Sequence, residues 1–323
     1  MTGLSKQVEV ARPAGWRRMF FLQPTEVDFD IRGFRREPAA TRTGLETSGN
    51  AFLTGFNLEL CTPAGVVPDL SGIAPDRRGF GVEGAAMAAC MLDLLRPFGG
   101  VRRLAALHDA YADRYVYLLH VGTGWALAKL HRTRPRRMAV ADGLLGWLAC
   151  DGWGFCRAFF ASETALRHWQ RHPAVACDPT CAIRYQGLGR SLWFRECGTP
   201  DGLARRVAQL PESHAGDVWS GIALAATYAG AVEPGVYPAL RRLAGRHWPS
   251  AAQGAAFGAE AWRRCGHVPA HAVRAVAALA GTDVARAAEW TIRTRRDLDH
   301  PGASGTAYQT WRHRIQRLAT EAG

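Results

Sequence analysis

The chain has 323 residues, 48% of them hydrophobic, so it is long enough for a large core in one domain or two coupled ones, and a disordered chain is excluded. Its formal net charge is +12, yet only Lys6 and Lys129 are lysines, and the arginines form scattered doublets and no single basic arm. No nucleic-acid partner is therefore expected, because such a partner needs a clustered basic stripe or a recognisable reading motif.

Membrane-spanning and secretory segments are not expected either. The longest apolar runs, around 84–95 and 222–232, are shorter than the roughly 18 residues that a membrane span needs. Residues 1–24 lack the apolar core and the small-residue cleavage site of a secretory signal. We expect a cytoplasmic protein whose arginine doublets allow peripheral contact with an anionic membrane or an acidic carrier protein.

The predicted elements are mostly helices, because apolar residues recur at helical spacing along most of the chain. Helices are predicted at 80–95, 104–130, 142–150, 202–210, 217–232, 250–264, 270–279 and 283–296. Short strands are predicted where aromatic and branched residues lie between turn formers, at 27–34, 50–60, 155–160 and 190–197. Pro- and Gly-rich stretches at 61–76 and 172–179 predict surface connections. The expected fold class is mainly α with minor β.

Parts of the sequence resemble each other in conserved order. FGVEGAAMAACMLDLL (80–95) resembles DVWSGIALAATYAGAV (217–232), and HVGTGWALAKL (120–130) resembles SAAQGAAFGAE (250–260). We interpret this as an old tandem duplication. The predicted organisation is an N-terminal segment (1–29), two pseudo-repeats (30–152 and 153–292) and a C-terminal helix or tail (293–323), with the halves integrated into one domain.

Small residues lie one helical turn apart in these matched segments. The pairs are Gly84/Ala88, Gly124/Ala128, Gly221/Ala225 and Gly254/Gly258. A glycine inside a helix costs about 1 kcal/mol relative to alanine, so four such sites need a packing reason. We expect the two halves to pack through these small-residue faces in one central crossing, with an apolar cavity where the Gly84 and Gly221 helices meet.

Several motifs together resemble a known bacterial family. They are LETSGNAFLTGF (45–56), RRGFGVEGAAMA (77–88), GWALAKL (124–130), DGWGF (151–155), YQGLGRSLWF (185–194), DVWSGIALAATYAG (217–230) and AAQGAAFGAE (251–260). This pattern resembles the domain of unknown function 1702 family, whose members are often described as enediyne biosynthesis proteins. The resemblance implies a role in a polyketide natural-product pathway with long conjugated polyene intermediates, and it implies no known reaction.

Glu83 is the first candidate for chemistry. It lies at the start of an apolar helix, where an acid interacts favourably with the helix dipole. A half-buried carboxyl with a raised pKa would serve as a general acid or base on a bound polyene. The structural alternative is that Glu83 caps its helix or pairs with Arg77 or Arg78.

Arg190 and His120 are the other catalytic candidates. Arg190 follows a glycine-rich turn and precedes Trp193 and Phe194, so it is a candidate to hold a carboxylate, phosphate or thioester carbonyl. Alternatively, it forms a salt bridge with Asp217 or Glu83 that ties the halves together. His120 shares a predicted helix face with Asp113 and Tyr117, which suggests a proton relay, whereas a half-buried histidine with satisfied hydrogen bonds is the plainer reading.

No cofactor or metal is predicted. The chain lacks the usual nucleotide, hydrolase and zinc signatures, and the one suggestive spacing, CDPTC at Cys177 and Cys181, lacks a second ligand pair. The residues expected to bind substrate are Phe80, Gly84, Trp125, Trp193, Asp217, Trp219 and Gln253.

The leading functional hypothesis is a cofactor-independent enzyme that folds, cyclises or otherwise modifies a linear polyene in an apolar cavity between the halves. A second hypothesis is a non-catalytic protein of the same pathway that binds the polyene or scaffolds other pathway enzymes. A terpene-like polyene cyclase ranks last, because such an enzyme would need an Asp-rich motif that this sequence lacks. The sequence gives no indication of oligomeric state.

Overall fold

A computed structural model describes residues 12, 13, 15–95, 102–131, 143–171 and 178–322, and within these residues the fold is helical without any strand. The α-helices are α1 (Phe29–Arg32), α2 (Ala39–Cys61), α3 (Arg78–Leu94), α4 (Arg103–Lys129), α5 (Leu148–Phe159), α6 (Glu163–Gln170), α7 (Pro179–Arg195), α8 (Pro200–Ala208), α9 (Ala215–Tyr228), α10 (Val236–Ala244), α11 (Trp248–Cys265), α12 (Ala270–Ala280), α13 (Val284–Arg295) and α14 (Gly305–Ala322). The prediction of a mainly helical fold is confirmed.

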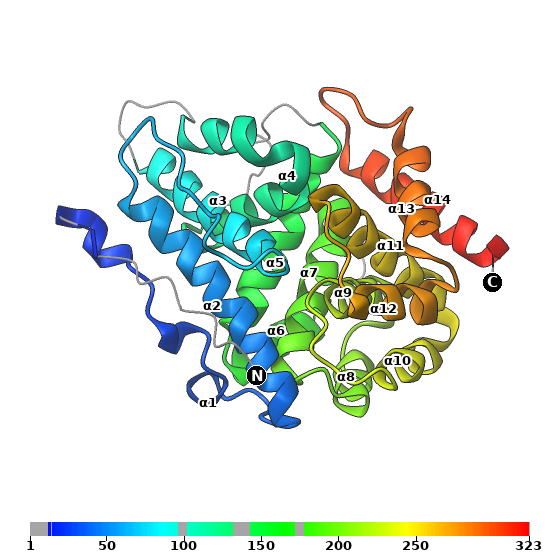
Figure 1. The fold of residues 1–323 in the computed structure, drawn as a ribbon. Coiled ribbons are helices and arrows are strands. Elements are labelled where there is room, and N and C mark those ends of the chain that lie inside the picture. Colours follow the sequence, from blue (N-terminus) through cyan, green and yellow to red (C-terminus); the bar gives the residue numbers. More distant parts are fainter. Residues whose placement is uncertain (1–11, 14, 96–101, 132–142, 172–177, 323) are drawn as a thin grey trace.

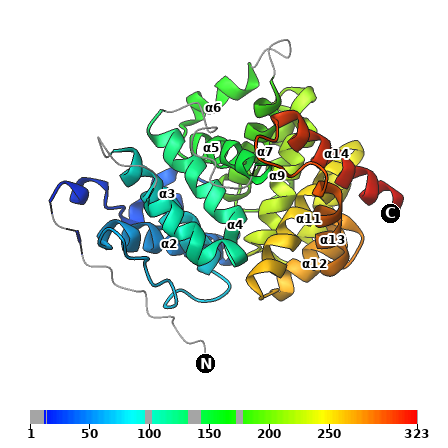
Figure 2. The ribbon, with the colours of Figure 1, turned by 90° about the horizontal axis from the view of Figure 1, so that it is seen from above.

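Seven of these helices form a serial array. In the order α2, α3, α4, α5, α7, α9 and α11, each helix packs against the next, and Figures 1 and 2 show these helices crossing the molecule from blue (α2) to gold (α11). Helix α11 also contacts α4, and α12, α13 and α14 cover its other sides. The array therefore curves back on itself, so that its helices enclose a common interior.

Glycines let neighbouring helices of this array approach closely. A Cβ atom added to Gly84 would lie 2.0 Å from the carbonyl oxygen of Phe52 in α2, and one added to Gly221 would lie 1.9 Å from that of Gln186 in α7. Gly124 and Gly254 make the same kind of approach, to α5 and α9. The prediction of helices packed through small-residue faces is confirmed.

The expected single crossing of four glycine-bearing helices is wrong. Gly84 faces α2 and Gly221 faces α7, so these two glycines do not share a junction. The helices that carry them do border a common apolar cavity, which Phe80 of α3 and Leu224, Ala225 and Tyr228 of α9 line. A small-residue face lets another helix approach closely but does not determine which helix that is. Here it is the preceding or following helix of the array that packs on each glycine. The tandem duplication stays a prediction from the sequence; its proposed boundary between 152 and 153 falls inside α5.

The predicted strands are helical instead. Residues 50–60 lie inside α2, residues 155–160 lie at the end of α5, residues 190–197 lie at the end of α7 and the turn after it, and 27–34 contains the short helix α1. Most side chains of α2 and α7 in these stretches are buried around the helix. In a helix buried on most sides, apolar and polar residues no longer alternate with a 3.6-residue period. Its many aromatic and branched residues then resemble the sequence of a strand.

The predicted helices after residue 200 agree closely with α8, α9, α11, α12 and α13. The helix predicted for 142–150 is wrong in its bounds: residue 142 lies outside the described residues, a 3-10 turn covers Leu145–Trp147, and α5 begins at Leu148. The connection predicted at 61–76 is non-helical and largely exposed, whereas most of 172–179 lies outside the described residues. Among the described residues, no helix combines the length and the apolar character that crossing a bilayer requires.

Candidate functional site

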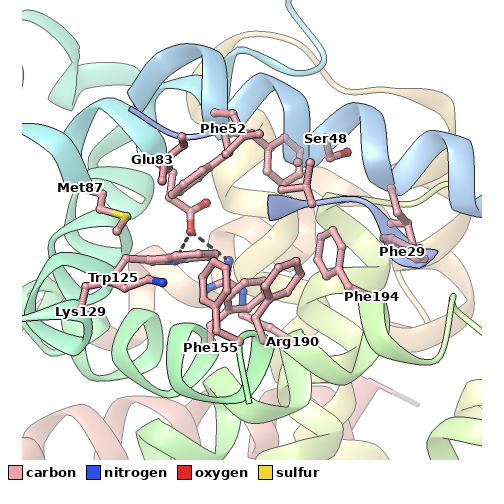
Figure 3. Close-up of a pocket in the computed structure, with 18 residues that line it drawn as sticks. Phe29, Ser48, Phe52, Glu83, Met87, Trp125, Lys129, Phe155, Arg190 and Phe194 are labelled. Atoms are coloured by element: carbon pink, nitrogen blue, oxygen red, sulfur yellow. Dashed lines mark hydrogen bonds and ion pairs between the residues drawn. The ribbon is translucent and has the colours of Figure 1, made fainter. Parts of the chain in front are cut away.

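An apolar cavity lies within α2, α3, α4, α5 and α7. Including its opening, about 690 Å³ of its space is free of protein atoms. Aromatic side chains form much of its wall: Phe29, Phe52, Phe80, Trp125, Phe155, Phe159, Phe160 and Phe194. The charged residues that line it are Glu83, Lys129 and Arg190 (Figure 3).

Glu83 projects from α3 into this cavity. The residue is only 2% exposed, and Trp125 Nε1 on α4 donates a 3.0 Å hydrogen bond to its Oε1 atom. Arg190 Nη2 on α7 lies 3.6 Å from the same oxygen (Figure 3). Three separate helices thus hold the carboxyl group at one place on the cavity wall.

Arg190 is shared between two carboxyl groups. Its Nη1 atom forms an ion pair with Asp151 on α5, its Nη2 atom faces Glu83, and its guanidinium lies 5.0 Å from the ring centre of Phe155. All three charged side chains are buried. One cation therefore lies between two acids in an environment that solvates charge poorly, and full ionisation would leave an excess negative charge.

This arrangement shifts proton affinities. The pKa of Glu83 is raised to about 7, because burial, helped by the charge of Asp151, outweighs the lowering effects of Arg190 and of the Trp125 hydrogen bond. Burial alone would lower the pKa of Arg190, but the Asp151 and Glu83 carboxylates outweigh that effect and raise it. Glu83 is therefore the group of the cluster that exchanges a proton near neutral pH, as a general acid or base should.

A buried network of polar side chains forms hydrogen bonds that lead to Asp151. Gln186 Nε2 donates a 2.8 Å hydrogen bond to Asp151 Oδ2. The Ser220 hydroxyl lies 3.2 Å from Gln186 Oε1 and 2.9 Å from Gln253 Oε1, and Arg312 Nε donates to the same Gln253 oxygen at 3.2 Å. These contacts fix the side chain of Asp151, and through it the guanidinium of Arg190.

Another buried acid shows that burial alone does not mark the site. Glu59 contacts Arg103 Nη1 at 2.6 Å, and burial raises its pKa to about 7 as well. It does not line the cavity around Glu83. Glu83 is distinguished by having both the raised pKa and a space beside it for a ligand.

Four of the predicted site residues meet at this cavity: Glu83, Arg190, Phe80 and Trp125. The structural alternative that Arg190 forms a salt bridge with Glu83 is also confirmed. The alternative pairing of Glu83 with Arg78 is wrong, because the Arg78 guanidinium donates to backbone carbonyls between residues 70 and 73.

The other predicted substrate-binding residues do not line this cavity: Gly84, Trp193, Asp217, Trp219 and Gln253. Gly84 faces the backbone of α2, and Trp193 lies against Gly198 while Phe194 takes the place on the wall. Trp219 is buried elsewhere in the core, and Gln253 belongs to the supporting network. Asp217 pairs with Arg312 at 2.7 Å and His214 at 2.9 Å.

The predicted proton relay through His120 is not formed. His120 stacks edge to face on His108, with ring centres 5.1 Å apart, and does not line the cavity. Burial and the neighbouring His108 lower its pKa to about 3, so it stays neutral at physiological pH. Asp113 is exposed, and α4 has non-helical backbone angles at Tyr115, which breaks the helix face expected for the relay.

A comparison with protein-family models identifies the family. The model described as "Protein of unknown function (DUF1702)" matches residues 14–319. The chain belongs to the DUF1702 family. No curated protein and no solved structure matches it. The chemistry of this DUF1702 protein therefore has to be inferred from its own site.

Sequence reasoning missed the supporting residues Asp151 and Gln186, although a signal for them exists. Several core helices of this DUF1702 chain carry a polar residue directly before a glycine at a helix crossing: Glu83–Gly84, Asp151–Gly152, Gln186–Gly187, Ser220–Gly221 and Gln253–Gly254. The glycine faces the adjacent helix, and the preceding residue is rotated about 100° from it toward the interior. A search for polar-glycine pairs in apolar helices would have found the network.

The CDPTC spacing is not described in full, because Cys177 lies outside the described residues while Cys181 is buried. Within the part of the DUF1702 chain that the structure describes, no three His, Cys, Asp or Glu side chains lie together as a metal site would need.

The pKa of Glu83 predicts a pH-dependent difference in stability between the wild type and Glu83→Gln. A carboxyl whose folded pKa is raised from 4.5 to about 7 stabilises the fold fully below its unfolded pKa and loses that contribution as the pH rises through the folded value. We therefore expect the free energy of unfolding of Glu83→Gln, relative to wild type, to rise by roughly 3 kcal/mol between pH 4.5 and 8. Urea unfolding at several pH values measures this.

Glu163→Gln is the matched control. Burial tends to raise the pKa of Glu163, but Arg206 and Arg195 outweigh it and lower that pKa, so this acid stabilises the fold above its unfolded pKa. That contribution is lost only as the pH falls below about 4.5, so the stability of Glu163→Gln relative to wild type should stay nearly constant between pH 4.5 and 8. A flat difference for Glu83→Gln across the same range would contradict the raised pKa.

Proposed function

We propose that this DUF1702 protein is an enzyme of enediyne-type polyketide biosynthesis that cyclises or isomerises a linear conjugated polyene, with Glu83 as its acid and base. The observation that carries the proposal is a carboxyl group with a pKa near 7 on the wall of a cavity that is otherwise mostly aromatic. Apolar pockets with a few converging polar groups are the usual form of small-molecule sites. The family resemblance supports the pathway and the polyene as substrate class.

The proposed step is a proton transfer. Protonated Glu83 donates its proton to a carbon of the bound polyene, which leaves a Glu83 carboxylate and a delocalised carbocation. Loss of a proton from another carbon, directly or after ring closure, returns the proton to Glu83. Atoms and electrons balance without any oxidant or reductant, because the product is an isomer of the substrate.

The site residues suit such a step. Trp125, Phe155 and Phe194 present aromatic rings to the cavity, and such rings stabilise cations through their faces. Arg190 already lies 3.6 Å from Glu83, so it would stabilise the carboxylate that forms when the proton leaves. Asp151 is a positioning residue that holds Arg190 in place.

The second candidate is a protein that binds the polyene without chemistry, alone or as a scaffold for a carrier protein or other pathway enzymes. The observation in its favour is that Glu83, Arg190 and Asp151 already pair with one another across three helices. In this second candidate, the cluster has a purely structural role and links α3, α5 and α7.

Glu83→Gln separates the two candidates. Purified protein is incubated with a synthetic all-trans linear polyene. Loss of the polyene's absorbance measures the rate, and chromatography with mass spectrometry detects the isomeric products. General acid–base catalysis contributes about 10²–10⁴-fold, so we expect the variant to lose at least about 100-fold of its rate while still binding the polyene. Glu163→Gln, outside the cavity, should keep the wild-type rate; equal rates for wild type and Glu83→Gln would leave only the binding function.

A further inference from the structure

A second cavity lies on the other side of Arg190. Including its opening, it contains about 550 Å³ of space free of protein atoms, and it lies between α3, α4, α5, α7, α9 and α11. Most of its wall is aliphatic or aromatic, including Leu118, Val121, Leu224, Ala225 and Phe257. Neither the proposed reaction nor the family description assigns a role to this space.

The two cavities share a wall made by the side chains of Phe80, Arg190 and Phe194, which line both. The acids of the central cluster divide between them, with Glu83 lining the first cavity and Asp151 the second. Arg190, paired with both acids, thus marks the place where the first cavity ends and the second begins. Arg190 is held by its two ion pairs, whereas the side chains of Phe80 and Phe194 can rotate more readily than a helix can move, so these two rings form a constriction that a ligand can open.

We infer that the two cavities are the arms of one channel, and that its ligand is an extended, unbranched and largely apolar chain whose middle passes Arg190. This inference rests on the proposed function, because the first arm must bind the polyene. The second arm is lined mostly by apolar side chains, and the charged residues that line it, Asp151 and Arg190, are paired with each other. It therefore suits a hydrocarbon tail. With the tail in the second arm, inner carbons of the chain lie beside Glu83, and a chain too short to reach the second arm lacks that anchor.

Binding of a short and a long ligand tests the channel. Both carry the same all-trans conjugated tetraene, and the long one adds a saturated unbranched alkyl tail; the fluorescence of the tetraene reports the equilibrium Kd. In the wild type the long ligand should bind at least about tenfold more tightly. Ala225→Leu, which fills the second arm, should abolish that advantage and leave the Kd of the short ligand within about twofold of wild type.

Ser48→Leu is the matched control in the first arm and should weaken both ligands, because Ser48 lines only that cavity. If Ala225→Leu does not fold, Ala261→Val fills the second arm from α11. Equal affinity of the two ligands for the wild type, or an undiminished advantage of the long ligand in Ala225→Leu, would overturn the channel while the proposed function stands. Failure of the wild type to bind either ligand would overturn both.

Discussion

Gly221→Ala is expected to destabilise the protein by about 3 kcal/mol or more, although alanine is the better helix former. The added Cβ would lie 1.9 Å from the carbonyl oxygen of Gln186 and 2.8 Å from the backbone nitrogen of Arg190. Both contacts are to the backbone of α7, so no side-chain rotation relieves them. Helix α9 must move away from α7, which also disturbs the hydrogen bond between Ser220 and Gln186.

Gly235→Ala is the matched control for this prediction. No atom lies within 4 Å of a Cβ built at Gly235, and its φ is −64°, so alanine fits there without strain. We expect its stability to stay within about 0.5 kcal/mol of the wild type. Thermal and urea unfolding followed by circular dichroism compare the two variants; a Gly221→Ala variant as stable as Gly235→Ala would contradict the close packing of α7 and α9.

Parts of the fold could be predicted because local sequence determines them. The helices predicted at 202–210 and 270–279 agree with α8 and α12, since each of these two helices buries one face and exposes the other. Segments such as 50–60 were predicted as strands because α2 is buried on most sides there, and its sequence carries no helical period. Tertiary burial, which the sequence does not display, removed the signal.

The sequence identifies the charged residues Glu83 and Arg190 of the site, but it does not show which side chains they contact. Glu83 is distinctive as one acid in a run of small and apolar residues, and a glycine-rich context likewise singles out Arg190. Asp151 is separated from Arg190 by 39 positions, and nothing local indicates that α5 places it beside α7. His120 was wrongly placed because the expected face of α4 ignores the backbone irregularity at Tyr115.

Arg190→Met is expected to destabilise the protein by about 3–5 kcal/mol at pH 8, because it leaves Glu83 and Asp151 buried without their cation. The loss should depend on pH. Arg190 lowers the pKa of Glu83 in the wild type, so its removal raises that pKa above about 7. A carboxyl with a raised folded pKa loses its contribution as the pH rises, so the stability deficit of the variant should grow between pH 6 and 9.

Arg195→Met provides the comparison within the same helix. Arg195 is also buried, but its acid partner Glu163 is half exposed. Burial acts to raise the pKa of Glu163, and Arg206 and Arg195 together outweigh it and hold that pKa low. The deficit of Arg195→Met should therefore stay constant between pH 6 and 9, because Glu163 is ionised throughout this range with or without Arg195. Urea unfolding at pH 6, 7, 8 and 9 measures both deficits. If the two stability deficits stay parallel, Arg190 contributes only packing and hydrogen bonds, as Arg195 does, and its charge does not act on Glu83. If only the Arg190→Met deficit grows with pH, Arg190 is the cation that keeps the pKa of Glu83 near neutral pH, as the proposed proton transfer requires.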